Sequence, residues 1–174
     1  MDDSPLKIKA SDIDEATFLE TYGGIYEHSL WVAKNVWSAK TGTELDTLRG
    51  LSAAMKSAVE AAPEPVKTAL LCAHPDLAGK LAVGETLTAD SRSEQAGAGL
   101  DNCSAEEYEE FQKLNSAYKE KFAFPFIIAV KGHNRQSILS HFRARLLGDR
   151  ETEFNSAMNE VHKIAGVRLK QLTE

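Results

Sequence analysis

The stretch that decides the fold is SAEEYEEFQKLNSAYKEK, residues 104–121. Ser104 is followed three residues later by Glu107, the pattern of a capping box, in which each side chain bonds the other residue's backbone N–H at a helix start. Apolar residues then recur at the spacings of three and four that give a helix one buried face: Tyr108, Phe111, Leu114 and Tyr118. The stretch therefore predicts a helix that runs to about Lys121.

The same period and similar start signals occur along nearly the whole chain. Three further helices are expected to begin at or after a capping residue: one opens at Ser11 and runs through Leu19, one lies beyond Thr43, and one begins at Thr88. Four more are expected at about 24–39, 66–73, 135–147 and 151–172, and Gly148 is the break between the last two. Beyond Thr43, one apolar face is predicted for Leu48, Leu51, Met55 and Val59. Together these signals predict that residues 1–174 form one all-α domain, an irregular bundle of about seven to nine helices.

One apolar run does not fit this pattern: FAFPFIIAV, residues 122–130. It is too short for a typical buried helix, and no second strand is evident for it to pair with, so we expect a buried extended segment. Its backbone N–H and C=O groups need hydrogen-bond partners, and a polar ligand can supply them. Plain core packing is the alternative.

Composition limits the function classes. The 174 residues are 43% hydrophobic and 26% charged, as in ordinary globular proteins, and the net charge of -6 argues against a nonspecific nucleic-acid binder. Cys72 and Cys103 lack metal-ligand spacing, and we expect reduced thiols. There is no apolar run of a secretory signal and no stretch of ~20 apolar residues, so we expect a cytoplasmic protein without membrane contact.

His74 is the first candidate for chemistry. It follows a short apolar helix and precedes Pro75, which disfavours α conformation in the residue before it. The carbonyl groups at that helix end and the carboxylate of Asp76 favour the imidazolium, whereas burial opposes it. A histidine balanced in this way can exchange a proton in acid–base catalysis. The alternative is that His74 only caps its helix.

The second candidate for chemistry is the stretch LTADSRSEQAGAGL, residues 87–100. If Thr88 caps a helix, then Ser91, Glu94 and Gln95 lie on one face. A hydroxyl, a carboxylate and an amide can bind a small nitrogen-rich heterocycle, and they can also orient a histidine. A merely solvated helix face is the alternative.

Together these segments resemble the 2-oxo-4-hydroxy-4-carboxy-5-ureidoimidazoline (OHCU) decarboxylases. The resemblance covers about 70–169, in the family's order and spacing. It is carried by HPDLAG at 74–79, Leu87-Thr88, SRSEQ at 91–95, Gly99-Leu100, LNSAYKEKF at 114–122 and FPF at 124–126.

The resemblance implies a carboxy-lyase that converts OHCU to S-allantoin in urate breakdown with no metal and no organic cofactor. It implies His74 as proton donor, with Glu94 as its partner or as an anchor for the ureido and ring N–H groups. It implies a homodimer, with Trp31 or Trp37 as interface candidates, and urate oxidase and hydroxyisourate hydrolase as pathway neighbours. The substrate-binding residues that it implies are Pro75, Ser91, Arg92, Ser93, Gln95, Phe126, Ile127, Ile128, Ala129, Val130 and Arg168.

Two alternatives stay open at this point. The tripeptide His74-Pro75-Asp76 is also the signature of J-domain co-chaperones, but there the preceding helix presents a basic face, and here it carries only Lys67. The other alternative is a catalytically inactive helical protein that retains the binding pocket.

Overall fold

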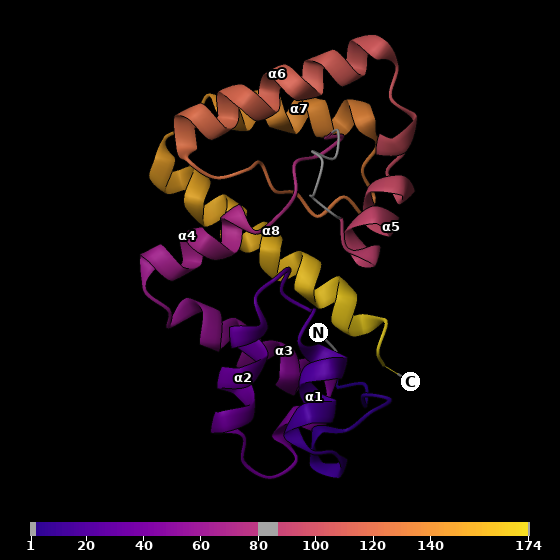
Figure 1. Ribbon diagram of the computed structural model, residues 1–174, viewed down its shortest axis with the longest axis vertical. Helices are drawn as coiled ribbons and strands as arrows, with labels where there is room; N and C mark the ends of the chain where they lie inside the picture. The colour runs from indigo at the N-terminus through magenta and orange to yellow at the C-terminus, as the bar shows by residue number, and fades with distance from the viewer. Residues whose placement is uncertain (1–2, 80–86, 174) are drawn as a thin grey trace. The chain divides into compact units, whose positions relative to one another are not determined.

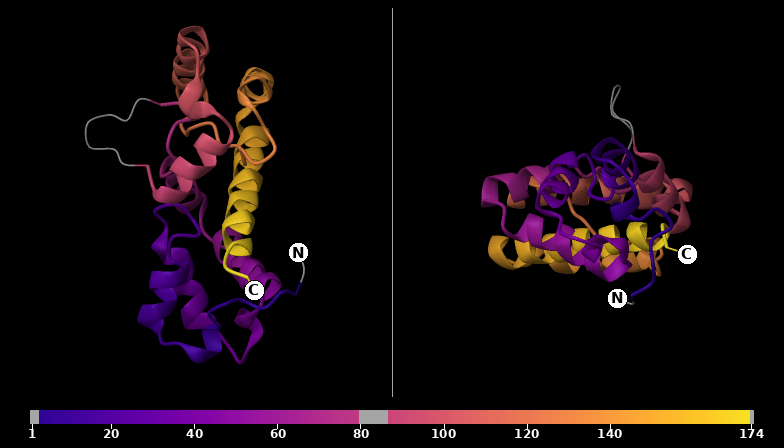
Figure 2. Two further views of the ribbon diagram at one scale, coloured as in Figure 1. Left: turned by 90° about the vertical axis from the view of Figure 1, so that its right-hand side faces the viewer. Right: turned by 90° about the horizontal axis from the view of Figure 1, so that it is seen from below.

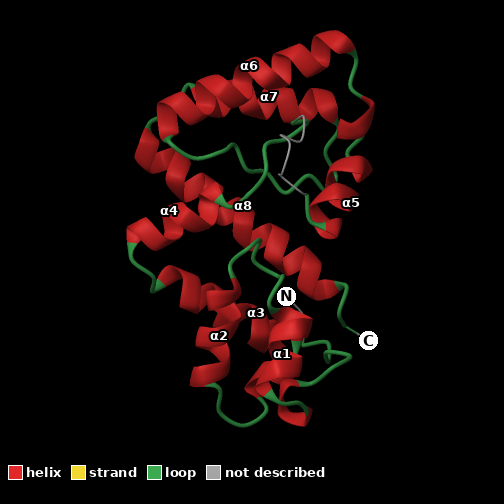
Figure 3. Ribbon diagram, in the orientation of Figure 1, coloured by secondary structure: helices red, strands yellow, loops and turns green. Residues whose placement is uncertain are grey.

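The computed structural model describes residues 3–79 and 87–173. Over these ranges it contains helices and loops but no strand, and its only bridges are two isolated pairs, Pro5 with Thr47 and Leu6 with Thr173 (Figure 3). The predicted all-α class is therefore confirmed. The helices are α1 (Glu15–Tyr22), α2 (Leu30–Ala39), α3 (Leu48–Glu60), α4 (Glu64–Cys72), α5 (Ala89–Gly97), α6 (Ala105–Phe122), α7 (Arg135–Leu146) and α8 (Arg150–Lys170).

The chain forms two compact units, and α8 contributes to both of them. The first unit comprises the chain up to Ala73 and the segment from His162 onward, and the second comprises 74–161. Helix α8 is one uninterrupted element (yellow in Figure 2).

In the first unit, α1, α2 and α3 pack in sequence order (Figure 1). The predicted apolar face of α3 is confirmed, because its four residues are almost fully buried: Leu48, Leu51, Met55 and Val59. Aromatic side chains from α1 complete this core, and Phe18 packs its ring against Tyr22 at 5.0 Å and Trp37 at 5.1 Å. Each large apolar side chain buried in this way contributes about 1.5–3 kcal/mol.

Three predicted helix starts in this unit are wrong, each because another residue caps the helix or the chain turns first. Helix α1 is capped by Asp14, which accepts from the N–H of Thr17 at 2.9 Å, and not by Ser11. Helix α2 begins at Leu30 rather than near Gly24, since His28 has a φ of 47° that breaks the helical path. Helix α3 is capped by Thr47, and Thr43 instead precedes a short 3₁₀ turn.

Three polar contacts tie the second half of α8 to the segment before α2 and to the end of α3. The Tyr26 hydroxyl lies 2.8 Å from Nδ1 of His162, whose Nε2 lies 2.9 Å from Oε1 of Glu60. Beside them, Nη1 of Arg168 pairs with Oε2 of Glu27 at 2.7 Å, and both residues are buried. The Glu27–Arg168 pair places two opposite charges inside the first unit, where each depends on the other.

The His162 contact predicts an acid-sensitive stability. Burial lowers the pKa of His162 from its ordinary 6.5, although the hydrogen bond to Glu60 opposes the shift. The imidazole of His162 therefore binds a proton more weakly in the folded protein than in the unfolded chain. The contribution of neutral His162 to the free energy of unfolding is complete above pH 6.5, and it is lost as the pH falls from there through the lowered pKa. We expect the melting temperature to fall between about pH 7.5 and about pH 5, and to fall less in His162→Asn. Thermal unfolding of both proteins across this range checks it, and equal slopes would contradict it.

In the second unit, α6 packs along α7 (Figure 1). The predicted capping box is confirmed, since Ser104 accepts from the N–H of Glu107 and Glu107 accepts from that of Ser104. The predicted break at Gly148 is also confirmed, because α7 ends at Leu146 and α8 begins at Arg150.

The run from Phe124 to Val130 is buried apart from the half-buried Ala129, and it forms neither helix nor strand, in agreement with a buried non-helical segment. It follows Ala123, which ends α6 in the left-handed conformation at a φ of 66°. The rings around it form one aromatic core, in which Phe126 stacks on Phe142 at 3.9 Å and Tyr118 meets Phe126 edge-on at 5.4 Å. This core fixes the course of a segment that has no regular hydrogen-bond ladder of its own.

Candidate active site

His74 lies at the start of a short loop in the second unit. Helix α4 ends at Cys72, two residues before it, as the following Pro75 predicts. The His74 residue is 9% exposed, while Pro75 and Asp76 are half-buried. The imidazole is therefore largely shielded from bulk water, which strengthens its interactions with other polar groups.

Side chains of α5 and α6 hold the loop that follows His74. The amide of Gln95 accepts from the N–H of Ala78 at 3.2 Å and donates to the C=O of Asp76 at 3.4 Å. From α6, Asn115 donates to the C=O of Leu77 at 2.9 Å and Gln112 donates to that of Ala78 at 3.0 Å. The loop 76–78 is thus fixed by three side-chain amides.

An ion pair and a strained residue complete this loop. Nζ of Lys119 lies 2.6 Å from Oδ2 of Asp76. Ala78 adopts a φ of 49°, which is uncommon for a residue with a Cβ and is maintained here by the hydrogen bonds on both of its peptide groups. Such strain indicates a loop whose shape is imposed by its surroundings, as catalytic loops often require.

Asn115 is expected to be necessary for this loop to fold. Its residue is 3% exposed, and Asn115→Leu would leave the buried C=O of Leu77 without a donor. We expect the free energy of unfolding to fall by about 1–3 kcal/mol. Urea denaturation measures this change, with Asn155→Leu at an exposed position of α8 as the matched control. Equal effects of the two substitutions would contradict the prediction.

Helix α5 presents the polar face that the sequence predicts. Thr88 caps it, accepting from the N–H of Ser91 at 3.2 Å. Ser91 is buried and Glu94 and Gln95 are half-buried, whereas Arg92 and Ser93 are exposed. Because Gln95 bonds residues 76 and 78, the inner face of α5 lies directly against the loop that His74 begins.

The other predicted site residues do not all lie in the same unit as His74. Phe126, Ile127, Ile128 and Val130 are buried in the second unit. Arg168 belongs to the first unit, where it pairs with Glu27. Its contact with substrate stays a prediction, and so do the contacts of Arg92 and Ser93.

Several residues that shape the site were not predicted from the sequence. Gln112, Asn115 and Lys119 hold the His74 loop, and only Asn115 carried a usable signal. It lies on the same helical face as Phe111, Tyr118 and Phe122, and a polar side chain within such an apolar face indicates a specific buried hydrogen bond.

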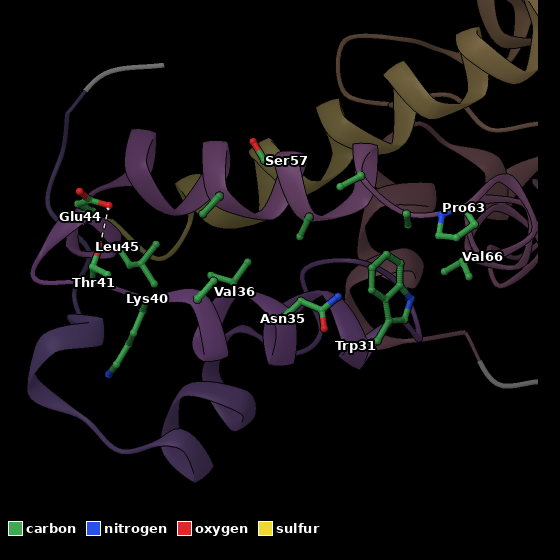
Figure 4. Close-up of a pocket in the computed structure, with 15 residues that line it drawn as sticks. Trp31, Asn35, Val36, Lys40, Thr41, Glu44, Leu45, Ser57, Pro63 and Val66 are labelled. Carbon is green, nitrogen blue, oxygen red and sulfur yellow. Dashed lines mark hydrogen bonds between the residues drawn. The ribbon is translucent and has the colours of Figure 1, made fainter.

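A separate groove of about 790 Å³ lies in the first unit, between α2 and α3 (Figure 4). Trp31, Pro63 and Val66 lie at one end, and Lys40, Thr41 and Glu44 lie at the other (Figure 4). Between them the walls are largely formed by alanines. This lining lacks the histidine and carboxylate combination of the His74 region, so we place the candidate active site in the second unit.

Comparison with known proteins decides the family. The family model described as OHCU decarboxylase matches residues 11–170. The chain belongs to the OHCU decarboxylase family. The OHCU decarboxylase of Haloferax volcanii is 42% identical over 159 residues, which cover 91% of this chain and 90% of that protein. This family match confirms the resemblance and the expected carboxy-lyase class, and it replaces the J-domain alternative.

Two further similar proteins carry other names. The uric acid degradation bifunctional protein PucL of Bacillus subtilis is 38% identical over 162 residues, or 93% of this chain and 31% of that longer protein. A crystal structure of (S)-allantoin synthase superimposes with a TM-score of 0.76 at 32% identity, covering 94% of this chain and 52% of that chain.

Within 3–79 and 87–173, every helix is too short or too polar to cross a bilayer.

Proposed function

We propose that this OHCU decarboxylase-family protein converts OHCU to S-allantoin, with His74 as the proton donor and Glu94 as its partner. The observation that carries the proposal is the attachment of the Ser91, Glu94 and Gln95 face to the loop that begins at the buried His74. It supports a site in which an imidazole, a carboxylate and a hydroxyl converge on one small ligand.

In the proposed reaction, the bond between the ring carbon and the carboxylate breaks and carbon dioxide leaves. The electron pair of that bond passes into the conjugated ring and carbonyl system of the substrate. His74 then delivers a proton from one face to the adjacent ring carbon, which carries the ureido group, and this forms the C–H bond of a single enantiomer. The hydroxyl on the decarboxylated carbon loses its proton and becomes a ring carbonyl of the product. Positioned proton transfer of this kind typically contributes about 10²–10⁴-fold in rate.

Glu94 and Ser91 are proposed to act beside His74. A carboxylate near an imidazole favours its protonated form, and it also accepts hydrogen bonds from ureido or ring N–H groups. Gln95 is proposed to act mainly through the loop, since both ends of its amide already bond residues 76 and 78.

The segment 126–130 is proposed to bind the substrate ring. Ile128 is 6% exposed, and neither its N–H nor its C=O has a hydrogen-bond partner among the described residues. Unpaired buried backbone groups are costly, and a bound polar ring would satisfy them.

The experiment that tests this function follows OHCU itself. OHCU is generated in place from urate by urate oxidase and hydroxyisourate hydrolase, and its absorbance decay is recorded with and without the protein. We expect decay to accelerate in proportion to protein concentration. A decay rate unchanged by the protein would instead support the inactive binding protein.

A homodimer and a place beside urate-degrading enzymes in the cytoplasm are also proposed. The bifunctional uric acid degradation relative supports the pathway assignment. The half-buried Trp31, at one end of the groove in the first unit, is the proposed interface residue (Figure 4). Sedimentation equilibrium tests this, and a monomer at assay concentration would contradict it.

A further inference from the structure

The peptide groups on either side of Ile128 are both held by charged side chains. Nη1 of Arg145 donates to the C=O of Ile127 at 2.7 Å. Oε2 of Glu160 accepts from the N–H of Ala129 at 2.8 Å. These two side chains come from α7 and α8, so the segment is fixed from outside itself.

Arg145 is in turn held by a buried network. Its Nε donates to Oε1 of Glu153 at 2.8 Å, and the Tyr118 hydroxyl donates to the same oxygen. The Glu153 side chain is only 3% exposed. Burial, and then the hydrogen bond to Glu153, raise the pKa of Tyr118, so this hydroxyl stays protonated and donates. The guanidinium also lies 4.5 Å from the centre of the Phe126 ring, which leaves Arg145 little freedom to move.

The hydrogen bonds from Arg145 and Glu160 leave the N–H and C=O of Ile128 available to a ligand. The segment forms neither helix nor strand, and we take its backbone to be extended, as the sequence predicts. In an extended backbone, the N–H and C=O of one residue face the same edge, and those of its neighbours face the opposite edge. The C=O of Ile127 and the N–H of Ala129 therefore share one edge, which Arg145 and Glu160 occupy. The N–H and C=O of Ile128 share the other edge as an adjacent donor and acceptor.

We propose that Arg145 and Glu160 are positioning residues for the decarboxylation, which aim the N–H and C=O of Ile128 at the ring of the substrate. This inference rests on the proposed function, because it takes the segment 126–130 as part of the substrate site. An adjacent donor and acceptor complement a ring N–H next to a C=O, in the same way that two paired strand residues exchange two hydrogen bonds. The substrate feature recognised is thus the cyclic ureide and not the carboxylate that leaves.

Glu160 allows a matched test. Glu160→Met keeps the length of the side chain but removes the acceptor for Ala129, whereas Glu160→Gln retains an acceptor oxygen without the charge. We expect Glu160→Met to raise KM for OHCU about five- to tenfold with a much smaller change in kcat, and to weaken the binding of S-allantoin by a similar factor. Glu160→Gln should lie within about twofold of wild type in both measurements.

Arg145→Lys provides a second variant, which keeps the charge beside Glu153 but loses the forked geometry. It should raise KM in the same direction, at unchanged helical circular dichroism. An active wild type whose Glu160→Met and Arg145→Lys variants keep a normal KM would overturn the positioning role alone. Equal impairment in Glu160→Gln and Glu160→Met would overturn it too, because charge rather than the accepted bond would then matter. A wild type that leaves OHCU decay unchanged would overturn the proposed function itself.

Discussion

Replacement of His74 with alanine is expected to remove the acceleration of OHCU decay almost completely. The imidazole is the proposed proton donor, and loss of a positioned general acid typically costs about 10²–10⁴-fold in rate. The fold should survive, since the loop after His74 is held by the amides of Gln95, Gln112 and Asn115 and not by the imidazole alone. The measurement is kcat in the coupled urate assay, together with far-ultraviolet circular dichroism.

His141→Ala is the matched control for this substitution. His141 lies on α7 in the same unit, but it is exposed and its ring contacts that of His133 at 5.1 Å. Its replacement should leave kcat within about twofold of wild type, because surface substitutions rarely have large effects. A fully active His74→Ala protein would contradict the histidine mechanism.

Replacement of Glu27 with alanine is expected to cause the largest loss of stability. Glu27 and Arg168 pair at 2.7 Å, and their side chains are 0% and 4% exposed. Removal of one partner leaves a buried charge without its counter-charge, which typically costs about 3–5 kcal/mol. For a chain of this length, that loss corresponds to a fall of roughly 6–20 °C in melting temperature.

Glu20→Ala is the control, because Glu20 is an exposed glutamate on α1 in the same unit. Thermal unfolding of both variants at neutral pH gives the comparison. A Glu27→Ala melting temperature within about 2 °C of the control would show that the pair contributes little to the fold.

Much of the fold was predictable because its signals are local. The capping box of α6, the Thr88 cap of α5 and the Gly148 break each depend on residues within a few positions of one another. The starts of α1, α2 and α3 were missed where a better cap or a turn lies a few residues further on. Asp14 and Thr47 displace the expected caps, and the left-handed His28 delays α2.

The site was less predictable, since its geometry depends on contacts between distant residues. Asn115 reaches Leu77 across 38 positions and Gln112 reaches Ala78 across 34, and no local pattern encodes such partners. The resemblance identified His74 and Glu94, but it did not show that Gln95 holds the loop. Nor did it show that Arg145 and Glu160 hold the segment around Ile128.

The optical activity of the product tests the central claim most directly. Protonation by His74 from one face must give one enantiomer, whereas unassisted decay of OHCU gives both. With urate oxidase and hydroxyisourate hydrolase present, addition of this protein should give allantoin with circular dichroism of one sign, that of the S form. Racemic allantoin at every protein concentration would contradict the account.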